Sequence, residues 1–223
     1  TVKTLADLHY ISFGIGQKND VHAENLSEDY RSFDVYCFGK FYTHVHLNVY
    51  GRHNVYNALA AAAASYVMSI DGESVALGLA SFTGAGRRME FKGKYHGADI
   101  YDDYAHHPGE LHALIDAVKT MGYKRIIIAF QPHTYTRTKA LFDDFVRELK
   151  RVDVAVLAEI YAAREQNTIG ISSRDLARQI PNAVYFETLP EVAAHLRSIA
   201  SEGDIILTVG AGDIYKAGEM LLK

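Results

Sequence analysis

Residues 125–138 read RIIIAFQPHTYTRT, and in this stretch an apolar run passes directly into a polar turn and a helix start. The run Arg125–Phe130 has the length and the branched side chains of a buried strand, and Thr136–Lys150 has a helical pattern. A buried strand that leads at once into a helix is typical of a parallel sheet in an α/β domain. Ligands of such sheets lie beyond the carboxyl ends of the strands, where the polar turn falls.

The same alternation extends from about residue 89 to the end of the sequence. Strands are expected at Asp99–Tyr101, Arg125–Phe130, Val152–Ala158, Ala183–Phe186 and Ile205–Val209. Helices are expected at Gly109–Met121, Thr136–Lys150, Ser172–Gln179, Pro190–Ser201 and Asp213–Leu222. The first residues of one of them, 172–175, have the spacing of a capping box. We therefore predict a mostly parallel sheet with helices on both faces.

The sequence before this region has a different pattern of polar and apolar residues. Polar and apolar residues alternate in Phe33–Phe38 and Tyr42–Tyr50, which predicts a half-buried antiparallel pair. Helices are expected at Asn54–Ser69 and Glu73–Phe82. These elements are too few for a complete domain, so residues 1–88 are interpreted as the tail of a larger one, with the boundary near Thr83–Met89.

The composition excludes several classes of protein. The 223 residues are 48% hydrophobic and 22% charged with a net charge of −4, unlike a disordered tail or a nucleic-acid-binding surface. No apolar run approaches the roughly 20 residues that span a bilayer, so membrane insertion is not expected. The single cysteine, Cys37, rules out an internal disulfide and fits a reducing cytoplasm. Because it lies in an expected strand between Tyr36 and Phe38, we interpret it as a packed thiol and not as a nucleophile.

The first of four polar clusters, GRHNVYNA at residues 51–58, lies at a strand-to-helix junction. Asn54 and Asn57 are three residues apart and share one face near the helix start, where their amides can pair with the edge of an adenine. The alternative is that Asn54 simply caps the alanine-rich helix that follows.

The second cluster, GAGRRME at residues 84–90, places Arg87 and Arg88 behind flexible glycines. A guanidinium matches phosphate oxygens, so the pair can clamp a phosphate. A solvated basic linker is equally consistent with the pattern.

The third cluster, DDYAHHP at residues 102–108, lies between an expected strand and an expected helix. Two carboxylates and two imidazoles are poor core material, because buried charges need partners. An aspartate here suits a ribose or Mg²⁺, and a histidine suits proton transfer or substrate binding. A structural role stays open as an alternative. A Zn²⁺ site is another, with ligands among Asp103, His106, His107, His112 and His133, although adjacent histidines cannot easily face one metal.

The fourth cluster, FQPHTYTRT at residues 130–138, places His133 and Arg137 on either side of a turn that opens a helix. Arg137 can bind a small carboxylate with help from helix-start N–H groups. The alternative, an exposed first-turn arginine, is disfavoured because a cation early in a helix opposes the macrodipole. Two weaker signals follow later strands. YAARE at 161–165 can line the same crevice, and GAGD at 210–213 lacks the G-x-G-x-x-G spacing and is interpreted as a tight turn.

Taken in order, the motifs G-x-H-N-x-x-N-A, G-A-G-R-R, D-D-Y-A-H-H-P, F-Q-P-H-x-Y-T-R-T, Y-A-A and G-A-G-D resemble the Mur ligase family, and within it the members that add L-alanine. The resemblance covers essentially the whole chain. It implies a Rossmann-like amino-acid-binding domain at residues 89–223, preceded at residues 1–88 by the C-terminal remainder of a central ATP-binding domain. It also implies a cytoplasmic enzyme of peptidoglycan synthesis, with a part in cell-wall biogenesis, cell shape and cell division.

The activity implied by the resemblance is ATP-dependent ligation of L-alanine to UDP-N-acetylmuramate. ATP phosphorylates the muramate carboxylate to an acyl phosphate while Mg²⁺ screens the charge, the amine of L-alanine attacks, and phosphate leaves. The small-molecule partners are therefore L-alanine, UDP-N-acetylmuramate and ATP, with no nucleic acid. No metal ligand is assigned here, because an acidic segment for the catalytic Mg²⁺ is absent from these residues.

The resemblance also implies roles for single residues. The residues matched to ATP binding are His53, Asn54, Asn57, Arg88 and Asp103, with Arg88 on the phosphate side and Asp103 at the ribose. The residues matched to the amino-acid pocket are Tyr104, His106, His133 and Arg137. Those matched to catalysis are His106, His133 and Arg88.

The sequence departs from the family pattern at several points. The phosphate loop G-x-x-G-K-[ST] is absent, so these residues are expected to be a fragment that is inactive alone. Many relatives have an arginine where this chain has Thr134, which removes a two-arginine carboxylate clamp and leaves more of the binding to Arg137. Arg164 stands where some relatives have glycine, and it can compensate for the missing arginine.

Three alternatives to this function stay open. One is the related ligase that recycles a preformed tripeptide, against which the segment 130–133 argues. Another is a nucleotide- or amino-acid-binding module without catalysis of its own. The third is a zinc hydrolase, which predicts stoichiometric metal.

Overall fold

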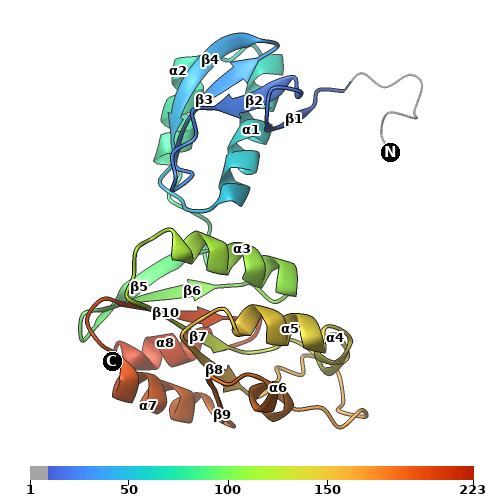
Figure 1. The fold of residues 1–223 in the computed structure, drawn as a ribbon, viewed down its shortest axis with the longest axis vertical. Coiled ribbons are helices and arrows are strands. Elements are labelled where there is room, and N and C mark those ends of the chain that lie inside the picture. The colour runs from blue at the N-terminus through green and yellow to red at the C-terminus, as the bar shows by residue number, and fades with distance from the viewer. Residues whose placement is uncertain (1–9) are drawn as a thin grey trace. The chain divides into compact units, whose positions relative to one another are not determined.

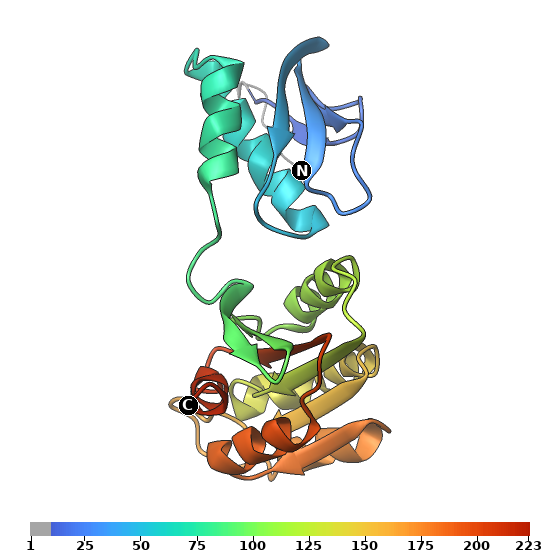
Figure 2. The same ribbon diagram turned by 90° about the vertical axis from the view of Figure 1, so that its left-hand side faces the viewer.

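The structure, a computed structural model, describes residues 10–223. The chain divides into two compact units, Thr1–Thr83 and Gly84–Lys223. Figures 1 and 2 show the elements of both units. Each unit has its own sheet and its own hydrophobic core.

The first unit is built on a four-stranded sheet in the order β1-β2-β3-β4. Its strands are β1 (Phe13–Ile15), β2 (Val21–Glu24), β3 (Ser32–Cys37) and β4 (Lys40–His46), and its helices are α1 (Arg52–Val67) and α2 (Gly72–Ser81). β1 and β2 pair in parallel, whereas β2, β3 and β4 are antiparallel. The predicted hairpin and both predicted helices are confirmed. β1 and β2, at three and four residues, are too short to show a periodic pattern and were not foreseen.

Alternation along the hairpin explains the core of this unit. Phe33, Val35 and Cys37 are buried on one face of β3, and Val45 is buried on β4. This face packs against the buried side of α1. Desolvation raises the pKa of the Cys37 thiol to about 11, so the thiol stays protonated at neutral pH and unreactive. The interpretation of Cys37 as a packed thiol is confirmed.

The second unit is built on a six-stranded sheet in the order β5-β6-β10-β7-β8-β9. Its strands are β5 (Glu90–Tyr95), β6 (Ala98–Asp103), β7 (Arg125–Phe130), β8 (Val154–Ala158), β9 (Ala183–Phe186) and β10 (Asp204–Val209). All pairings are parallel except that of the edge strand β5 with β6. The predicted mostly parallel sheet is confirmed. β5 was not foreseen, because most of its side chains are exposed and its register shifts next to Gly93.

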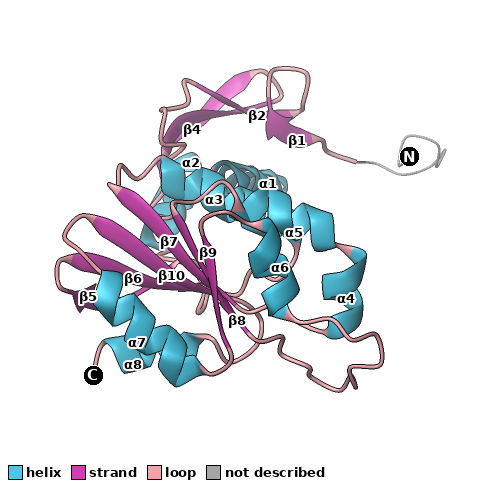
Figure 3. Cartoon of the chain, turned by 60° about the horizontal axis from the view of Figure 1, so that its bottom comes forward, coloured by secondary structure: helices cyan, strands magenta, loops and turns pink. Residues whose placement is uncertain are grey.

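Helices cover both faces of this sheet, as predicted (Figure 3). They are α3 (Pro108–Lys119), α4 (Tyr135–Ala140), α5 (Phe142–Leu149), α6 (Ser173–Gln179), α7 (Leu189–Ile199) and α8 (Tyr215–Leu221). Successive residues of the central strands face opposite layers: Ile128 packs with α3, α5 and α6, whereas Ile127 and Ala129 pack with α7 and α8. The strands are therefore apolar throughout, as doubly covered strands must be.

One predicted helix is wrong. The stretch Thr136–Lys150 forms two helices, α4 and α5, because Leu141 leaves the helical region with φ −114° and ψ 23°. Leu141 packs against the core between the sheet and helices α3, α5 and α6. The break lets α5 bury Phe145 and Leu149 in the same core. The apolar periodicity is continuous across the break, so the sequence pattern does not show it.

Capping residues fix two helix starts near the carboxyl edge of the sheet. The predicted capping box before α6 is confirmed: Ser172 and Asp175 bond each other's backbone N–H groups. A second box, not foreseen, lies before α3, where His107 accepts from the N–H of Gly109 and Glu110 accepts from the N–H of His107. Over residues 10–223 the structure has no helix with the length and apolarity needed to cross a membrane.

Candidate active site

The loops after β6, β7, β8 and β10 emerge at one edge of the second sheet. Phe130, the last residue of β7, pairs with both Val209 of β10 and Leu157 of β8, so the carboxyl ends of these parallel strands coincide. An isolated parallel bridge between His133 and Tyr161 extends the pairing beyond the strands. Ligands of parallel sheets bind at this edge.

Four aromatic side chains form a row along this edge. The ring of Tyr104 meets His106 edge-on at 5.5 Å, His106 lies 6.0 Å from His133, and His133 stacks on Tyr161 at 5.7 Å. The structure therefore brings together Tyr104, His106 and His133, which the sequence assigned to one pocket from two separate motifs. Tyr161, which the sequence suggested only as a lining residue, closes the row and is 39% exposed.

Two buried polar atoms beside this row have no hydrogen-bond partner within residues 10–223: Nδ1 of His133 and Nη1 of Arg137. Buried polar atoms without a partner are uncommon in native proteins and indicate a place for a ligand or water. Burial lowers the pKa of His133, and Arg137 and His106 lower it further, whereas Glu165 opposes them. His133 is therefore largely neutral at pH 7 and able to accept a proton.

The backbone at Thr134 is strained. Its φ of 69° and ψ of 143° are unusual for a residue with a Cβ and still more so for a β-branched one. Such a conformation costs about 1–3 kcal/mol and persists where the surroundings over-determine it, most often at functional sites. The turn between β7 and α4 is thus held in shape by its contacts and not by its own preferences.

The structure bears on two expectations about this turn. The N–H of Thr136 at the start of α4 is not free to assist a ligand, because it donates to Oε2 of Glu165 at 2.9 Å. In addition, α4 has only six residues, so Arg137 lies in its last turn as much as in its first and does not oppose the macrodipole.

The two arginines of the second cluster do not act as one clamp. Arg87 donates from Nε to Asp102 at 2.8 Å and from Nη2 and Nη1 to the carbonyls of Gly210 and Gly212 at 2.8 and 3.3 Å. Its guanidinium is therefore used within the protein. Arg88 has a side chain that is 50% exposed and lies 3.9 Å from Glu110, so only Arg88 of this pair is available to a phosphate.

The aspartates of the third cluster are buried and hydrogen-bonded. Both oxygens of Asp103 accept backbone N–H groups, from Met89 at 2.8 Å and from Ala105 at 2.8 Å. Burial nevertheless raises the pKa of Asp103. Asp102 accepts from Arg87 and from the hydroxyl of Thr208 at 2.8 Å. The structural alternative therefore holds for Asp102, and a ribose contact by Asp103 stays a prediction.

The adjacent histidines of this cluster have different environments. His106 lies in the aromatic row, with Nδ1 3.0 Å from the carbonyl of Tyr104 and 3.4 Å from Glu110. His107 caps α3 and is committed to that helix start. Among residues 10–223, no three histidine, cysteine, aspartate or glutamate side chains are arranged to hold a metal ion.

The interpretation of residues 210–213 as a tight turn is confirmed. Oε1 of Gln131 accepts the N–H groups of Asp213 and Ile214 at 2.9 and 3.1 Å, which ties the turn before α8 to the end of β7. A Cβ on Gly212 would lie 2.7 Å from the ring of Tyr161, so only glycine fits. Gln131, in a motif that the sequence treated as functional, is a structural residue.

In the first unit, the capping interpretation of Asn54 is wrong. Helix α1 begins at Arg52 after Gly51, and Asn54 lies inside its first turn, where its amide donates to the carbonyl of Tyr50 at 2.8 Å. Asn57 donates to Oδ1 of Asn54 at 3.0 Å, which confirms that the two amides share a face. His53 and Asn57 are exposed, four residues apart on α1.

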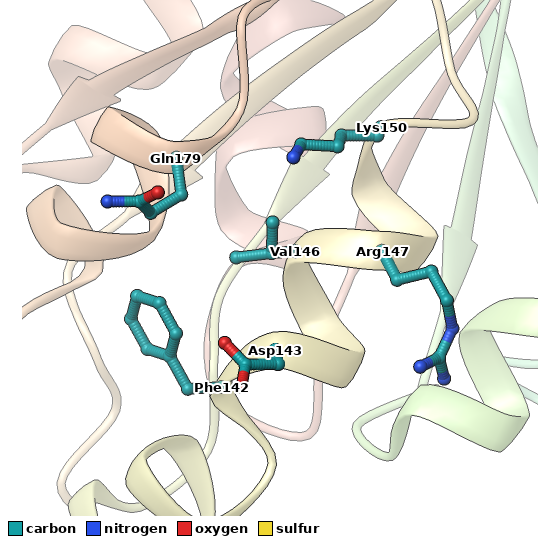
Figure 4. A pocket seen from close by; sticks show the side chains of 6 residues that line it. All are labelled: Phe142, Asp143, Val146, Arg147, Lys150 and Gln179. Atoms are coloured by element: carbon teal, nitrogen blue, oxygen red, sulfur yellow. The ribbon is translucent and has the colours of Figure 1, made fainter.

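A pocket on α5 and α6 lies apart from these residues. Its six lining residues are Phe142, Asp143, Val146, Arg147, Lys150 and Gln179 (Figure 4). None of them is a predicted site residue. Its lining mixes both signs of charge with apolar carbon and defines no ligand chemistry.

Comparison with known proteins assigns the chain to a protein family. Residues 87–212 match the sequence family described as "Mur ligase, glutamate ligase domain", and residues 3–65 match "Mur ligase middle domain". The chain therefore belongs to the Mur ligase family, which confirms the resemblance drawn from its motifs.

Two relatives and one solved structure show which members of this family the chain is similar to. A UDP-N-acetylmuramate–L-alanine ligase from Agathobacter rectalis is 46% identical over 96% of this chain and 48% of its own length. One from Caldanaerobacter subterraneus is 42% identical over the same shares. The crystal structure of the UDP-N-acetylmuramate–alanine ligase of Thermotoga maritima superposes with a TM-score of 0.81 at 27% identity, over 99% of this chain and 49% of that one. The chain thus spans about half the length of the relatives it matches.

Proposed function

We propose that the whole protein is an ATP-dependent ligase that joins L-alanine to UDP-N-acetylmuramate through an acyl phosphate, in the cytoplasmic synthesis of peptidoglycan. The curated relatives at 42% and 46% identity, which carry the name of that activity, support this proposal. Its substrates are then ATP, UDP-N-acetylmuramate and L-alanine.

The observation that carries the proposal is the pair of unpartnered buried atoms, Nη1 of Arg137 and Nδ1 of His133. L-alanine offers a methyl group, an amine and a carboxylate, so most of its recognition must come from the carboxylate. A guanidinium matches a carboxylate in shape and charge. We assign Arg137 to the carboxylate, His133 to the amine as a proton acceptor, and Tyr104 and His106 to the walls of the pocket.

The remaining predicted residues are proposed for the nucleotide. Arg88 is the available cation of its pair and is assigned to the phosphates, in a catalytic role, because developing negative charge needs such a partner. Asp103 is assigned to the ribose, and His53, Asn54 and Asn57 to the adenine. The proposal treats residues 1–88 as the end of the ATP-binding domain and residues 89–223 as the amino-acid-binding domain.

Mg²⁺ is proposed as a cofactor of the whole protein, but residues 10–223 do not fit a Mg²⁺ site. Mg²⁺ binds carboxylate oxygens and water in octahedral geometry. Both oxygens of Asp103 already accept backbone N–H groups, and the described residues hold no cluster of three acidic or histidine side chains. No chemical step is therefore assigned to the metal here.

The test is L-alanine-dependent release of ADP by the whole protein in the presence of UDP-N-acetylmuramate and Mg²⁺. We expect L-alanine to support turnover and the tripeptide L-Ala-γ-D-Glu-meso-diaminopimelate not to. Turnover with the tripeptide alone would identify the recycling ligase instead. Nucleotide binding without turnover on either substrate would identify a non-catalytic module.

A further inference from the structure

The turn that carries Arg137 depends on another loop for its shape. Helix α4 begins after Thr134 without a side-chain cap of its own, and the backbone at Thr134 is in an unfavourable conformation. A six-residue helix is also too short to be stable by itself. The direction of the Arg137 guanidinium must therefore be set by contacts from outside the turn.

The loop after β8 supplies these contacts through its backbone. The N–H of Thr134 donates to the carbonyl of Tyr161 at 2.9 Å, and the N–H of Tyr161 donates to the carbonyl of Pro132 at 2.9 Å. This reciprocal pair fixes the entry of the turn. It also places the ring of Tyr161 on His133.

The same loop supplies the missing helix cap through Glu165. Oε2 of Glu165 accepts the N–H of Thr136 at 2.9 Å, and Oε1 accepts the hydroxyl of the same residue. The N–H of Glu165 donates to the carbonyl of Ala162 at 2.9 Å, which holds the glutamate on its own turn. One carboxylate thus fixes the first turn of α4 from the next strand along the sheet.

Glu165 also acts on the charge of the pocket. The titratable and charged groups that face His133 are Arg137 on α4, His106 after β6, and Tyr161 and Glu165 after β8. Arg137 and His106 lower the pKa of His133, whereas Glu165 raises it. Glu165 is the anion of this set. Its carboxylate caps α4 and is not part of the aromatic row.

We propose that Glu165 is a positioning residue of the amino-acid pocket, which holds Arg137 in the direction that binds the substrate carboxylate. Its charge also raises the pKa of His133, against the larger lowering by burial and by Arg137. Glu165 does not touch the substrate. This inference rests on the proposed ligase function. It makes the loop 161–165 part of the specificity of the enzyme, because the pocket depends on the direction of one guanidinium, that of Arg137, whose buried Nη1 has no partner within residues 10–223.

Two variants separate the two effects of Glu165. Glu165→Ala removes the cap, and we expect the KM for L-alanine to rise about 3- to 30-fold, the range of losing a helix cap, with the KM for ATP unchanged within twofold. Glu165→Gln keeps an acceptor for the N–H of Thr136 and removes the charge. We expect a rise in KM below about threefold and a shift of the acid limb of kcat/KM for L-alanine to lower pH, because His133 loses the charge that raises its pKa.

The experiment is steady-state kinetics of the whole protein at several pH values, with Glu187→Ala, at an exposed glutamate, as the control. A wild-type protein without L-alanine-dependent turnover would refute the proposed function and not this inference in particular. With an active wild type, an unchanged KM for L-alanine in Glu165→Ala overturns the inference. If Glu165→Ala does not fold, the pH profile of Glu165→Gln decides: an acid limb identical to the wild type overturns it. A parallel rise in both KM values would show a general structural role instead.

Discussion

Nε of Arg87 lies 2.8 Å from Oδ2 of Asp102, a carboxylate whose side chain is only 2% exposed. The same guanidinium donates to the carbonyls of Gly210 and Gly212 and lies over the rings of Tyr104 and Tyr215, each at 4.9 Å. One side chain therefore joins the segment before β5 to the ends of β6 and β10.

Arg87→Ala should destabilise the second unit by about 3 kcal/mol, because it leaves Asp102 buried without its cation. Arg178→Ala, which breaks an exposed pair with Asp175, is the matched control and should cost less than about 1 kcal/mol. Urea unfolding of the whole protein, followed by circular dichroism, measures both changes. Equal small effects of the two variants would show that Arg87 is dispensable for stability.

The same contact predicts where the second unit can be separated from the first. A polypeptide of residues 84–223 keeps Arg87 and should unfold in one cooperative transition. A polypeptide of residues 89–223 loses Arg87 and should be less stable by at least the cost of Arg87→Ala, since the same pair is broken and the N–H of Tyr104 also loses the carbonyl of Arg87. Thermal melts of the two polypeptides make the comparison, and identical midpoints would contradict it.

His133 should determine the acid limb of activity. Burial and the nearby Arg137 lower its pKa, so kcat/KM for L-alanine should rise through an apparent pKa below the ordinary histidine value of about 6.5. Arg137→Ala removes a cation and should move this limb to higher pH. His133→Asn should lower kcat and abolish the limb. A limb that survives in His133→Asn would assign it to another group.

Much of the second unit is predictable from the sequence because its strands are covered on both faces. Arg125–Phe130 and Ala183–Phe186 are found with the predicted bounds, and the polar clusters follow the strands as expected. Strand β5 is not predictable in this way, because none of its residues is buried. The break at Leu141 is not predictable either, because the apolar periodicity continues across it.

The sequence predicts which residues form the candidate site, but it does not predict what each of them does. Tyr104, His106 and His133 lie together because parallel strands end at one edge. The residue pattern by itself does not distinguish Arg87 from Arg88, or His106 from His107, because neighbours of one type differ only in the direction of their side chains. Only the family resemblance assigned roles to Arg88 and His106. Glu165 was missed as a helix cap because it lies 29 residues from Thr136 in sequence. The sequence gives no signal for it, because Thr134 at the N-cap position is itself of a type that caps helices, and only the structure shows that its side chain makes no cap bond.

Arg137 is the residue by which the turn between β7 and α4 is proposed to bind the carboxylate of L-alanine. In the whole protein, Arg137→Ala should raise the KM for L-alanine about 10- to 150-fold, the worth of a charge-assisted pair, and leave the KM for ATP nearly unchanged. Arg137→Lys should rescue only part of the loss, because a point charge cannot bond both carboxylate oxygens in the same geometry. Lys139→Ala, an exposed neighbour on α4, is the matched control and should behave as the wild type.

The decisive measurement is therefore the KM for L-alanine of Arg137→Ala, determined at saturating ATP and UDP-N-acetylmuramate. The assignment of the pocket predicts a rise of at least about tenfold with little change in the other two KM values. A KM for L-alanine within twofold of the wild type would contradict it.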